Sequence, residues 1–490
     1  MASPGRDSML EKGYFQDVET DSNPTQWQHA RASKSKWNMD FFRPSFLKRT
    51  SCQRKQNLRR TAYLDGLRGF AAFLVYWHHH HLWARDATHG DKILDNGWGY
   101  DNQYYFVAFP GIRTFFNGGH FAVTVFFVIS GYVLSAKPLS LIHAGDYLKL
   151  GDNLASALFR RYIRLHLPIM ITTFLYMTSW HAFGLWTEDA IHQRNWRDEV
   201  WTWYCEFKNF SFVFRTGGEL IFSYNFHLWS IPVEFRGSII IYTALMAFSR
   251  CRKNMRLLGE VVLIIYFLYI ADGWFGSLFV SGMLLYDLDM LAENDDLPGF
   301  FALLEPFKTP IYYVLFAVSM YLGGVPSPSA DVQVLRETPG WYYLSFLKPQ
   351  AVFDYKWFYL FWAATLLIVS IPRISWLKSF FEHRFNQHLG RISFSFYMIH
   401  GPVLWIVGNR FYSATGYARE THTIGIPEWI NAFPLSKAGP FGFDLAFWVP
   451  HLILLPLTLW LAELVTKTID EPTVRFSAWL YKQVLPKPGK

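Results

Sequence analysis

Cysteine is scarce in this sequence. The three cysteines, Cys52, Cys205 and Cys251, lie far apart and form no Cys-x-x-Cys pair. Thiols at such spacing supply neither a disulfide framework nor a zinc site. We therefore expect no redox chemistry from this chain.

Charge is also low for a chain of this length. Of 490 residues, 17% are charged, whereas 51% are hydrophobic and 19% are aromatic. A soluble enzyme of this size carries fewer apolar and aromatic side chains. These values indicate a polytopic membrane protein. The net charge of +8 is then read by position, because Lys and Arg collect on the cytoplasmic side of membranes. It gives no reason to expect a nucleic-acid partner.

A long apolar stretch is absent from residues 1–60, which are polar and basic. We expect no cleaved signal peptide here, but a largely disordered cytoplasmic tail. An all-α membrane domain of about ten transmembrane helices is predicted over residues 61–476, and a second cytoplasmic tail over 477–490. Basic connections place both termini inside. The expected spans are Leu67–Ala84, His120–Ala136, Leu165–Leu185, Ile231–Ser249, Leu257–Ala271, Trp274–Leu291, Pro310–Gly323, Trp357–Ile371, Ile392–Val407 and Phe443–Val465.

The first expected span carries an arginine near its start and histidines near its far end. Arg68 and His79 are eleven residues apart. Eleven steps of ~100° return almost to the starting angle, so both side chains lie on one helix face, roughly 16 Å apart. Ionisable side chains at membrane depth are costly and usually face a bundle interior or a wet cavity. This face is therefore a candidate functional site.

Four consecutive histidines, His78 to His81, end this span. A contiguous run points its rings to all sides of a helix, whereas two metal ligands on one face need a spacing of three or four. We expect no metal here. A tolerated interfacial cluster remains open beside our preferred interpretation, which is at least one catalytic imidazole. The spacing from Arg68 selects His79.

Three further polar groups are singled out. Arg160, Arg161 and Arg164 form a cluster within about one helical turn at the expected cytoplasmic face, able to bind phosphate or simply to anchor the topology. Glu234 lies just inside its expected span and is a candidate to orient a catalytic histidine. Asn209 begins an Asn-Phe-Ser glycosylation sequon in an expected outer segment.

Several motifs occur in a fixed order along the chain. They are DGLRG from Asp65 with the following His79, GGHFAVTVFFVISGYVL from Gly118, RRYIRLHLP from Arg160, HLWSIPVEF from His227, LGRISFSFYMIHGP from Leu389 and IDEPTVRF from Ile469. Together they resemble the membrane acyltransferase family called acyltransferase 3, over roughly residues 61–476.

The resemblance implies a ten-helix membrane enzyme that moves an acyl group, often acetyl, from acyl-CoA to a hydroxyl. It implies that Arg68 and His79 are the reactive pair and that Arg161 and Arg164 hold the CoA donor. Acyl-CoA is then a co-substrate, and no other cofactor is expected. The chemistry agrees, because acyl transfer needs a base near the hydroxyl and a means of holding a highly charged donor.

Two other functions remain open from the sequence. A polytopic transporter or channel would use intramembrane Arg, His and Glu as a proton relay. Such proteins commonly show paired repeats, and the sequence shows no matching halves. A non-catalytic relative would use the histidine run to sense pH. The sequence does not distinguish among a lipid, a glycan, a sterol and a secondary metabolite as the molecule that carries the acceptor hydroxyl.

Overall fold

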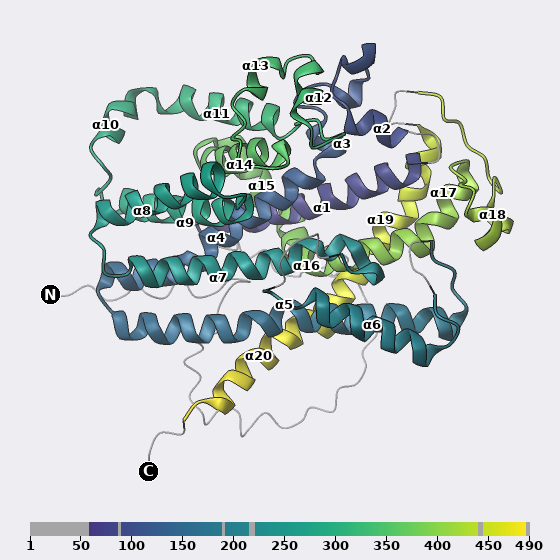
Figure 1. Ribbon diagram of the computed structural model, residues 1–490, viewed down its shortest axis with the longest axis horizontal. Coiled ribbons are helices and arrows are strands. Elements are labelled where there is room, and N and C mark those ends of the chain that lie inside the picture. The colour runs from purple at the N-terminus through teal and green to yellow at the C-terminus, as the bar shows by residue number, and fades with distance from the viewer. Residues whose placement is uncertain (1–57, 87–89, 189–191, 215–220, 440–443, 487–490) are drawn as a thin grey trace, which may run out of the picture.

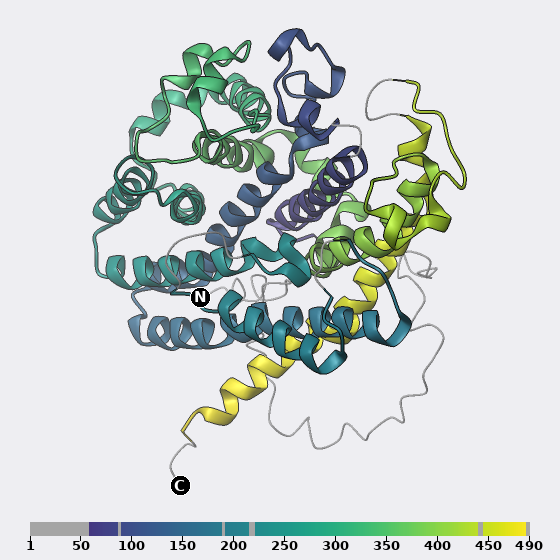
Figure 2. The same cartoon turned by 45° about the vertical axis from the view of Figure 1, so that its right-hand side comes forward.

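The computed structural model describes residues 58–86, 90–188, 192–214, 221–439 and 444–486, and the regular secondary structure in these ranges is entirely helical. The long helices run roughly side by side, and the N-terminal helix lies inside the bundle (Figures 1 and 2). The prediction of an all-α helical bundle is confirmed. The predicted tail over residues 1–60 lies almost wholly outside the described residues.

Helix α1 (Ala62–Arg85) lies at the centre and packs on α16 (Arg384–Val403) and α4 (Gly119–Ala144). Two glycines bring α1 and α16 into backbone contact. A Cβ added to Gly69 would lie 2.3 Å from the nitrogen of Gly390, and one added to Gly390 would lie 2.2 Å from the carbonyl oxygen of Asp65. Small residues allow such close approach of membrane helices. This contact fixes the position of Arg68 against α16.

Helix α5 (Tyr147–Phe183) differs most from the expectation. It is a single helix of 37 residues, whereas the sequence predicted a basic inner connection up to Arg164 and a span that begins at Leu165. At ~1.5 Å per residue the helix is ~55 Å long and exceeds the thickness of a bilayer core. Asp146 caps its start by accepting a hydrogen bond from the Lys149 backbone. The three arginines therefore lie on a rigid helix.

The chain reaches its C-terminal end through one long helical rod. It consists of α19 (Leu445–Val465), a π-helical turn η13 (Thr466–Asp470) and α20 (Glu471–Val484). Helix α20 packs against α5. The cytoplasmic tail predicted from residue 477 is thus helical up to Val484, and residues 487–490 lie outside the described part.

The other elements connect or surround this core. They are α2 (Gly90–Asp95), η5 (Tyr100–Asn102), η6 (Phe106–Ala108), α3 (Thr114–Asn117), α6 (Trp196–Phe210), η7 (Ser223–Trp229), α7 (Ser230–Phe248), α8 (Lys253–Ile265), η8 (Tyr266–Ile270), α9 (Trp274–Glu293), α10 (Phe300–Leu304), η9 (Glu305–Phe307), α11 (Lys308–Leu322), α12 (Val332–Glu337), α13 (Tyr342–Ser345), α14 (Tyr355–Ser370), η10 (Ile371–Arg373), α15 (Ser375–Glu382), η11 (Leu404–Gly408), α17 (Asn409–Thr415), α18 (His422–Gly425) and η12 (Pro427–Trp429).

Six helical segments among the described residues are long and apolar enough to cross a membrane. They are Gly119–Ala144, Ser223–Phe248, Trp274–Glu293, Phe300–Leu322, Tyr355–Arg373 and Leu445–Val484. Helix α1 is not among them, because its charged first half and its four histidines lower its hydropathy. The chain is a membrane helical bundle, and the count of ten spans stays a prediction.

Candidate active site

Arg68 is held tightly on the face of α1 that contacts α16. Its Nε donates to Ser393 Oγ at 3.0 Å, and its Nη2 donates to the carbonyl oxygen of Gly390 at 2.9 Å. Asp65, one turn earlier, lies 3.4 Å from Nη2. Because these partners come from two helices, the guanidinium has a fixed orientation within the bundle.

Arg161 forms an ion pair with Glu234 at the interface of α5 and α7. Its Nε also donates to Ser238 Oγ at 2.9 Å, and Ser130 of α4 donates to Glu234 Oε1 at 2.6 Å. These contacts join three helices through one carboxylate. No described hydrogen bond or ion pair joins Glu234 to a histidine, because this carboxylate pairs with Arg161; its role in orienting a catalytic histidine stays a prediction.

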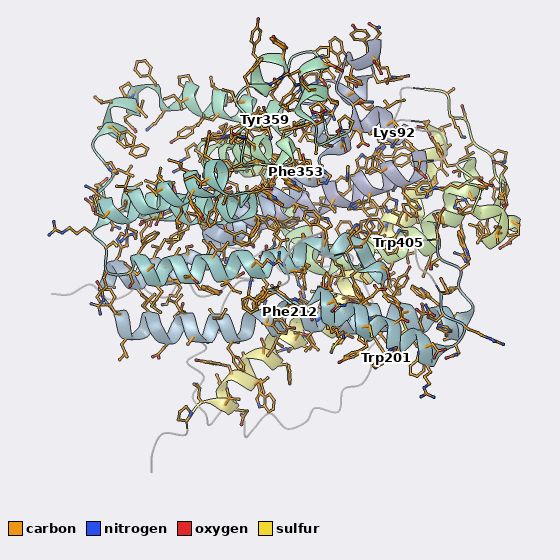
Figure 3. All side chains as sticks on the ribbon, viewed as in Figure 1. Lys92, Trp201, Phe212, Phe353, Tyr359 and Trp405 are labelled. Atoms are coloured by element: carbon orange, nitrogen blue, oxygen red, sulfur yellow. The ribbon has the colours of Figure 1, made fainter. Side chains whose placement is uncertain are left out.

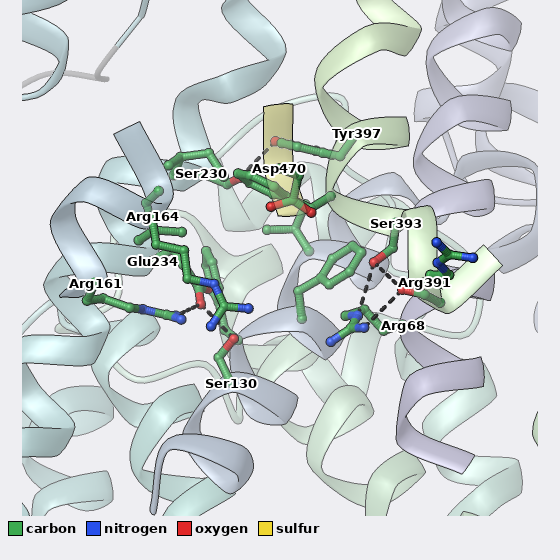
Figure 4. A pocket seen from close by; sticks show the side chains of 17 residues that line it. Arg68, Ser130, Arg161, Arg164, Ser230, Glu234, Arg391, Ser393, Tyr397 and Asp470 are labelled. Carbon is green, nitrogen blue, oxygen red and sulfur yellow. Dashed lines mark hydrogen bonds and ion pairs between the residues drawn. The ribbon is translucent and has the colours of Figure 1, made fainter. Parts of the chain in front are cut away.

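A pocket lies between these two arginines (Figure 4). Four arginines from α1, α5 and α16 line it together with two carboxylates, so the formal charge of its side chains is positive. Phenylalanine, leucine, isoleucine and valine side chains form an apolar part of its wall, and three serines, a tyrosine and a glycine complete it. The charged residues are Arg68, Arg161, Arg164, Arg391, Glu234 and Asp470. An excess of arginine above an apolar wall suits a ligand with both anionic and uncharged parts.

Arg160 is not among the residues that line this pocket. Its Nε donates along its own helix to the carbonyl oxygen of Ser156 at 3.2 Å. Residue 160 lies one turn before residue 164 and close to its helix face, so helical periodicity alone did not exclude Arg160 from the pocket. The structure thus brings two members of the predicted cluster together with Arg68 and leaves Arg160 outside.

Tyr397 connects the pocket wall to the histidines. Its hydroxyl lies 2.8 Å from Ser230 Oγ, which also lines the pocket, and donates to the carbonyl oxygen of His227. The Tyr397 carbonyl oxygen accepts from His400 Nδ1 at 2.6 Å. Polar contacts of Tyr397 therefore link the arginine pocket to the backbone of His227 and to the buried imidazole of His400.

His79 belongs to this same histidine cluster. Its Nδ1 lies 3.0 Å from Nε2 of His400, and its ring centroid lies 4.0 Å from that of His227. Trp405, labelled in Figure 3, also stacks on His227, with ring centroids 5.0 Å apart. Arg68 and His79 both contact α16, as their predicted position on one helix face requires.

The three histidines come from α1, η7 and α16, and one nitrogen of each lies within 4.8 Å of the others. Such a set of imidazoles can also serve as metal ligands. The sequence argument against a metal considered only the contiguous run, so it did not address this group. His227 and His400 were missed as site residues, although both lie in the quoted motifs.

The other three histidines of the run are fully buried, whereas His79 is partly exposed. His80 Nδ1 lies 2.6 Å from Tyr412 Oη. His81 stacks on Phe447 at 4.2 Å, and His78 packs edge to face on His120. The rings of His78, His80 and His81 are thus part of the packing of the bundle. His79 alone of the four joins the cluster beside the pocket.

Asn209 lies in the last turn of α6 and is exposed. The hydroxyl of Ser211, the third residue of the sequon, donates to the carbonyl oxygen of Lys208 at 3.3 Å. Glycosylation itself stays a prediction.

An arginine-lined pocket beside a histidine cluster inside a membrane helical bundle suits a membrane-embedded transferase. A family model described as an acyltransferase domain, Acyl_transf_3, matches residues 61–465, and the chain belongs to this family. It is 29% identical to the O-acetyltransferase PaAT-1 of Phomopsis amygdali over 506 aligned residues, which cover 94% of this chain and 92% of that protein. No solved structure matches the chain.

Proposed function

We propose that this membrane acyltransferase transfers an acyl group, most simply acetyl, from acyl-CoA to a hydroxyl of a lipid, glycan, sterol or secondary metabolite. The observation that carries the proposal is the pocket with four arginines, whose wall residue Tyr397 is hydrogen bonded to the cluster that contains His79. The O-acetyltransferase relative supports the reaction class and the choice of acetyl.

The pocket suits the donor. Arg164 and Arg391 offer guanidiniums to phosphate, and the apolar wall accommodates the uncharged pantetheine arm. Arg161 already neutralises Glu234, so its main contribution is to hold the pocket in shape. We place this pocket on the cytoplasmic side, where acyl-CoA is made, and both chain termini on that side as well.

Arg68 and His79 have separate tasks in this proposal. Eleven residues along a helix separate their backbones by roughly 16 Å, so the two side chains do not act on the same atom. Arg68 binds the donor within the pocket. We place His79 beyond the pocket, where the extended pantetheine arm of the donor brings the thioester close to the acceptor hydroxyl.

The reaction then proceeds with His79 as general base and general acid. Its imidazole takes the proton of the acceptor hydroxyl while that oxygen attacks the thioester carbonyl carbon. The tetrahedral intermediate collapses, the carbon–sulfur bond breaks, and the proton on His79 passes to the leaving CoA sulfur. The products are the O-acyl ester and free CoA, and the imidazole is restored.

The test uses membranes from cells that produce the protein. They are incubated with acetyl-CoA labelled in the acetyl group, and the label is followed into lipid, glycan and small-molecule fractions. We expect an alkali-labile ester that is absent from membranes without the protein and from membranes with His79→Ala. Label that appears equally in all three preparations contradicts the proposal. The transporter alternative receives no support, because the matched family is one of acyltransferases.

A further inference from the structure

His400 has one defined tautomer in this structure. Its Nδ1 lies 2.6 Å from the carbonyl oxygen of Tyr397, and a carbonyl oxygen can only accept a hydrogen bond. Nδ1 of His400 therefore carries a proton. A neutral imidazole has a single N–H, so Nε2 of His400 holds a lone pair. The backbone of α16 thus decides which nitrogen of this ring accepts.

The tautomer of His400 also determines the tautomer of His79. His79 Nδ1 lies 3.0 Å from the lone pair of His400 Nε2, so it must donate to it. With its proton on Nδ1, neutral His79 keeps a lone pair on Nε2. His79 is also the one partly exposed ring of its run. The basic atom of the partly exposed ring is therefore Nε2.

We propose that His400 is a positioning residue that holds His79 in the tautomer whose Nε2 accepts the proton of the acceptor hydroxyl. This inference rests on the proposed function. When a hydrogen bond fixes the proton on one imidazole nitrogen, the other nitrogen is the one available for chemistry. When Nε2 of His79 takes the proton, Nδ1–H continues to donate to His400, so the new positive charge faces an acceptor. The proton then leaves on the CoA sulfur.

His227 packs against the rings of both His79 and His400. Its ring lies 4.0 Å from that of His79 and 4.7 Å from that of His400, measured between centroids. The Tyr397 hydroxyl donates to its carbonyl oxygen, which fixes the backbone of η7 against α16. The rings therefore limit the rotation of His79 by packing, while His400 alone makes a hydrogen bond to it among the described contacts.

A metal ion is the competing arrangement for these three rings. It would require one lone pair from each ring to point at a common centre about 2.0–2.1 Å from each nitrogen. The 3.0 Å contact between His79 and His400 instead places a proton between two of the three nitrogens. The hydrogen bond and the metal therefore exclude each other, and a test can separate them.

The experiment compares His400→Gln with His400→Met, two unbranched side chains of similar size. Glutamine retains an oxygen that accepts from His79 Nδ1, whereas methionine offers only a weak acceptor. We expect His400→Met to lower kcat about 100-fold, within the range for a misplaced general base, with the KM for acetyl-CoA changed less than threefold. His400→Gln should recover at least a tenth of the wild-type kcat.

A second replacement keeps the test valid if His400→Met does not fold. His79 is replaced by Nε2-methylhistidine, which blocks the proposed basic atom and leaves the only lone pair of the neutral ring on Nδ1. Normal abundance with turnover at least 100-fold below wild type is expected. Turnover within threefold of wild type would place the base on another atom and overturn the assignment.

Other outcomes overturn the inference or the proposed function separately. Equal kcat values for the Gln and Met variants, or one equivalent of zinc retained by purified wild-type protein and lost in His400→Met, would remove the positioning role. His79→Ala is assayed in parallel. If this variant is fully active, the proposed base itself fails. If it is inactive while His400→Met remains fully active, only the inference about His400 fails.

Discussion

Arg164 provides the cleanest test of donor binding, because a matched arginine lies one turn away. Arg164 lines the pocket, whereas Arg160 on the same helix bonds to the carbonyl oxygen of Ser156 and lies outside it. A charge-assisted hydrogen bond contributes ~1.5–3 kcal/mol. Its loss in Arg164→Gln should raise the KM for acetyl-CoA by roughly 10- to 150-fold. Turnover at saturating donor should change little, since the reacting atoms are far from this residue.

The assay measures initial rates over a wide range of acetyl-CoA concentration in membranes with matched protein abundance. Arg160→Gln removes an equal charge from the same helix and should keep the wild-type KM. An identical rise of KM in both variants would show that the effect comes from net charge near the membrane. An unchanged KM in Arg164→Gln would refute the assignment of this pocket to the donor.

Three other predictions follow from the contacts. Arg161→Ala leaves the buried carboxylate of Glu234 unpaired, which costs about 3–5 kcal/mol. The variant should lose thermal stability in detergent and regain it when Glu234→Gln is added; no recovery would contradict the pairing. His80→Ala removes a buried ring bonded to Tyr412, so folded protein should decrease by size-exclusion profile, and unchanged abundance would contradict its packing role. Glycosidase treatment should shift the gel mobility of wild-type protein and not of Asn209→Gln; equal mobility would exclude a glycan there.

The sequence predicted the helical fold and the face of α1 that carries the site. Apolar segments of span length determine the fold class, and a period of 3.6 residues determines which residues share a face. Arg68 and His79 therefore lie as expected, both against α16. The extent of α5 was not predicted, because three arginines within about one turn indicated a connection between spans, whereas the helix continues through them from Tyr147 to Phe183.

The partners of His79 depend on tertiary contacts between segments far apart in sequence. His227 and His400 are separated by 173 positions, counted as 400 − 227, and meet because α1, η7 and α16 converge. Helical periodicity relates residues only within one helix, so it could not identify partners of His79 on other helices. Glu234 was proposed as a partner on chemical grounds alone. Histidines at corresponding depth in different spans are the signal that would have pointed to the cluster.

The most direct measurement of the central claim is the turnover of His79→Ala with acetyl-CoA, relative to wild type, in purified protein reconstituted in lipid. The two preparations must contain equal amounts of folded protein. Loss of a general base predicts a decrease of about 10²- to 10⁴-fold in kcat with little change in the KM for acetyl-CoA. A turnover within threefold of wild type would contradict the role of His79 and, with it, this account of the site.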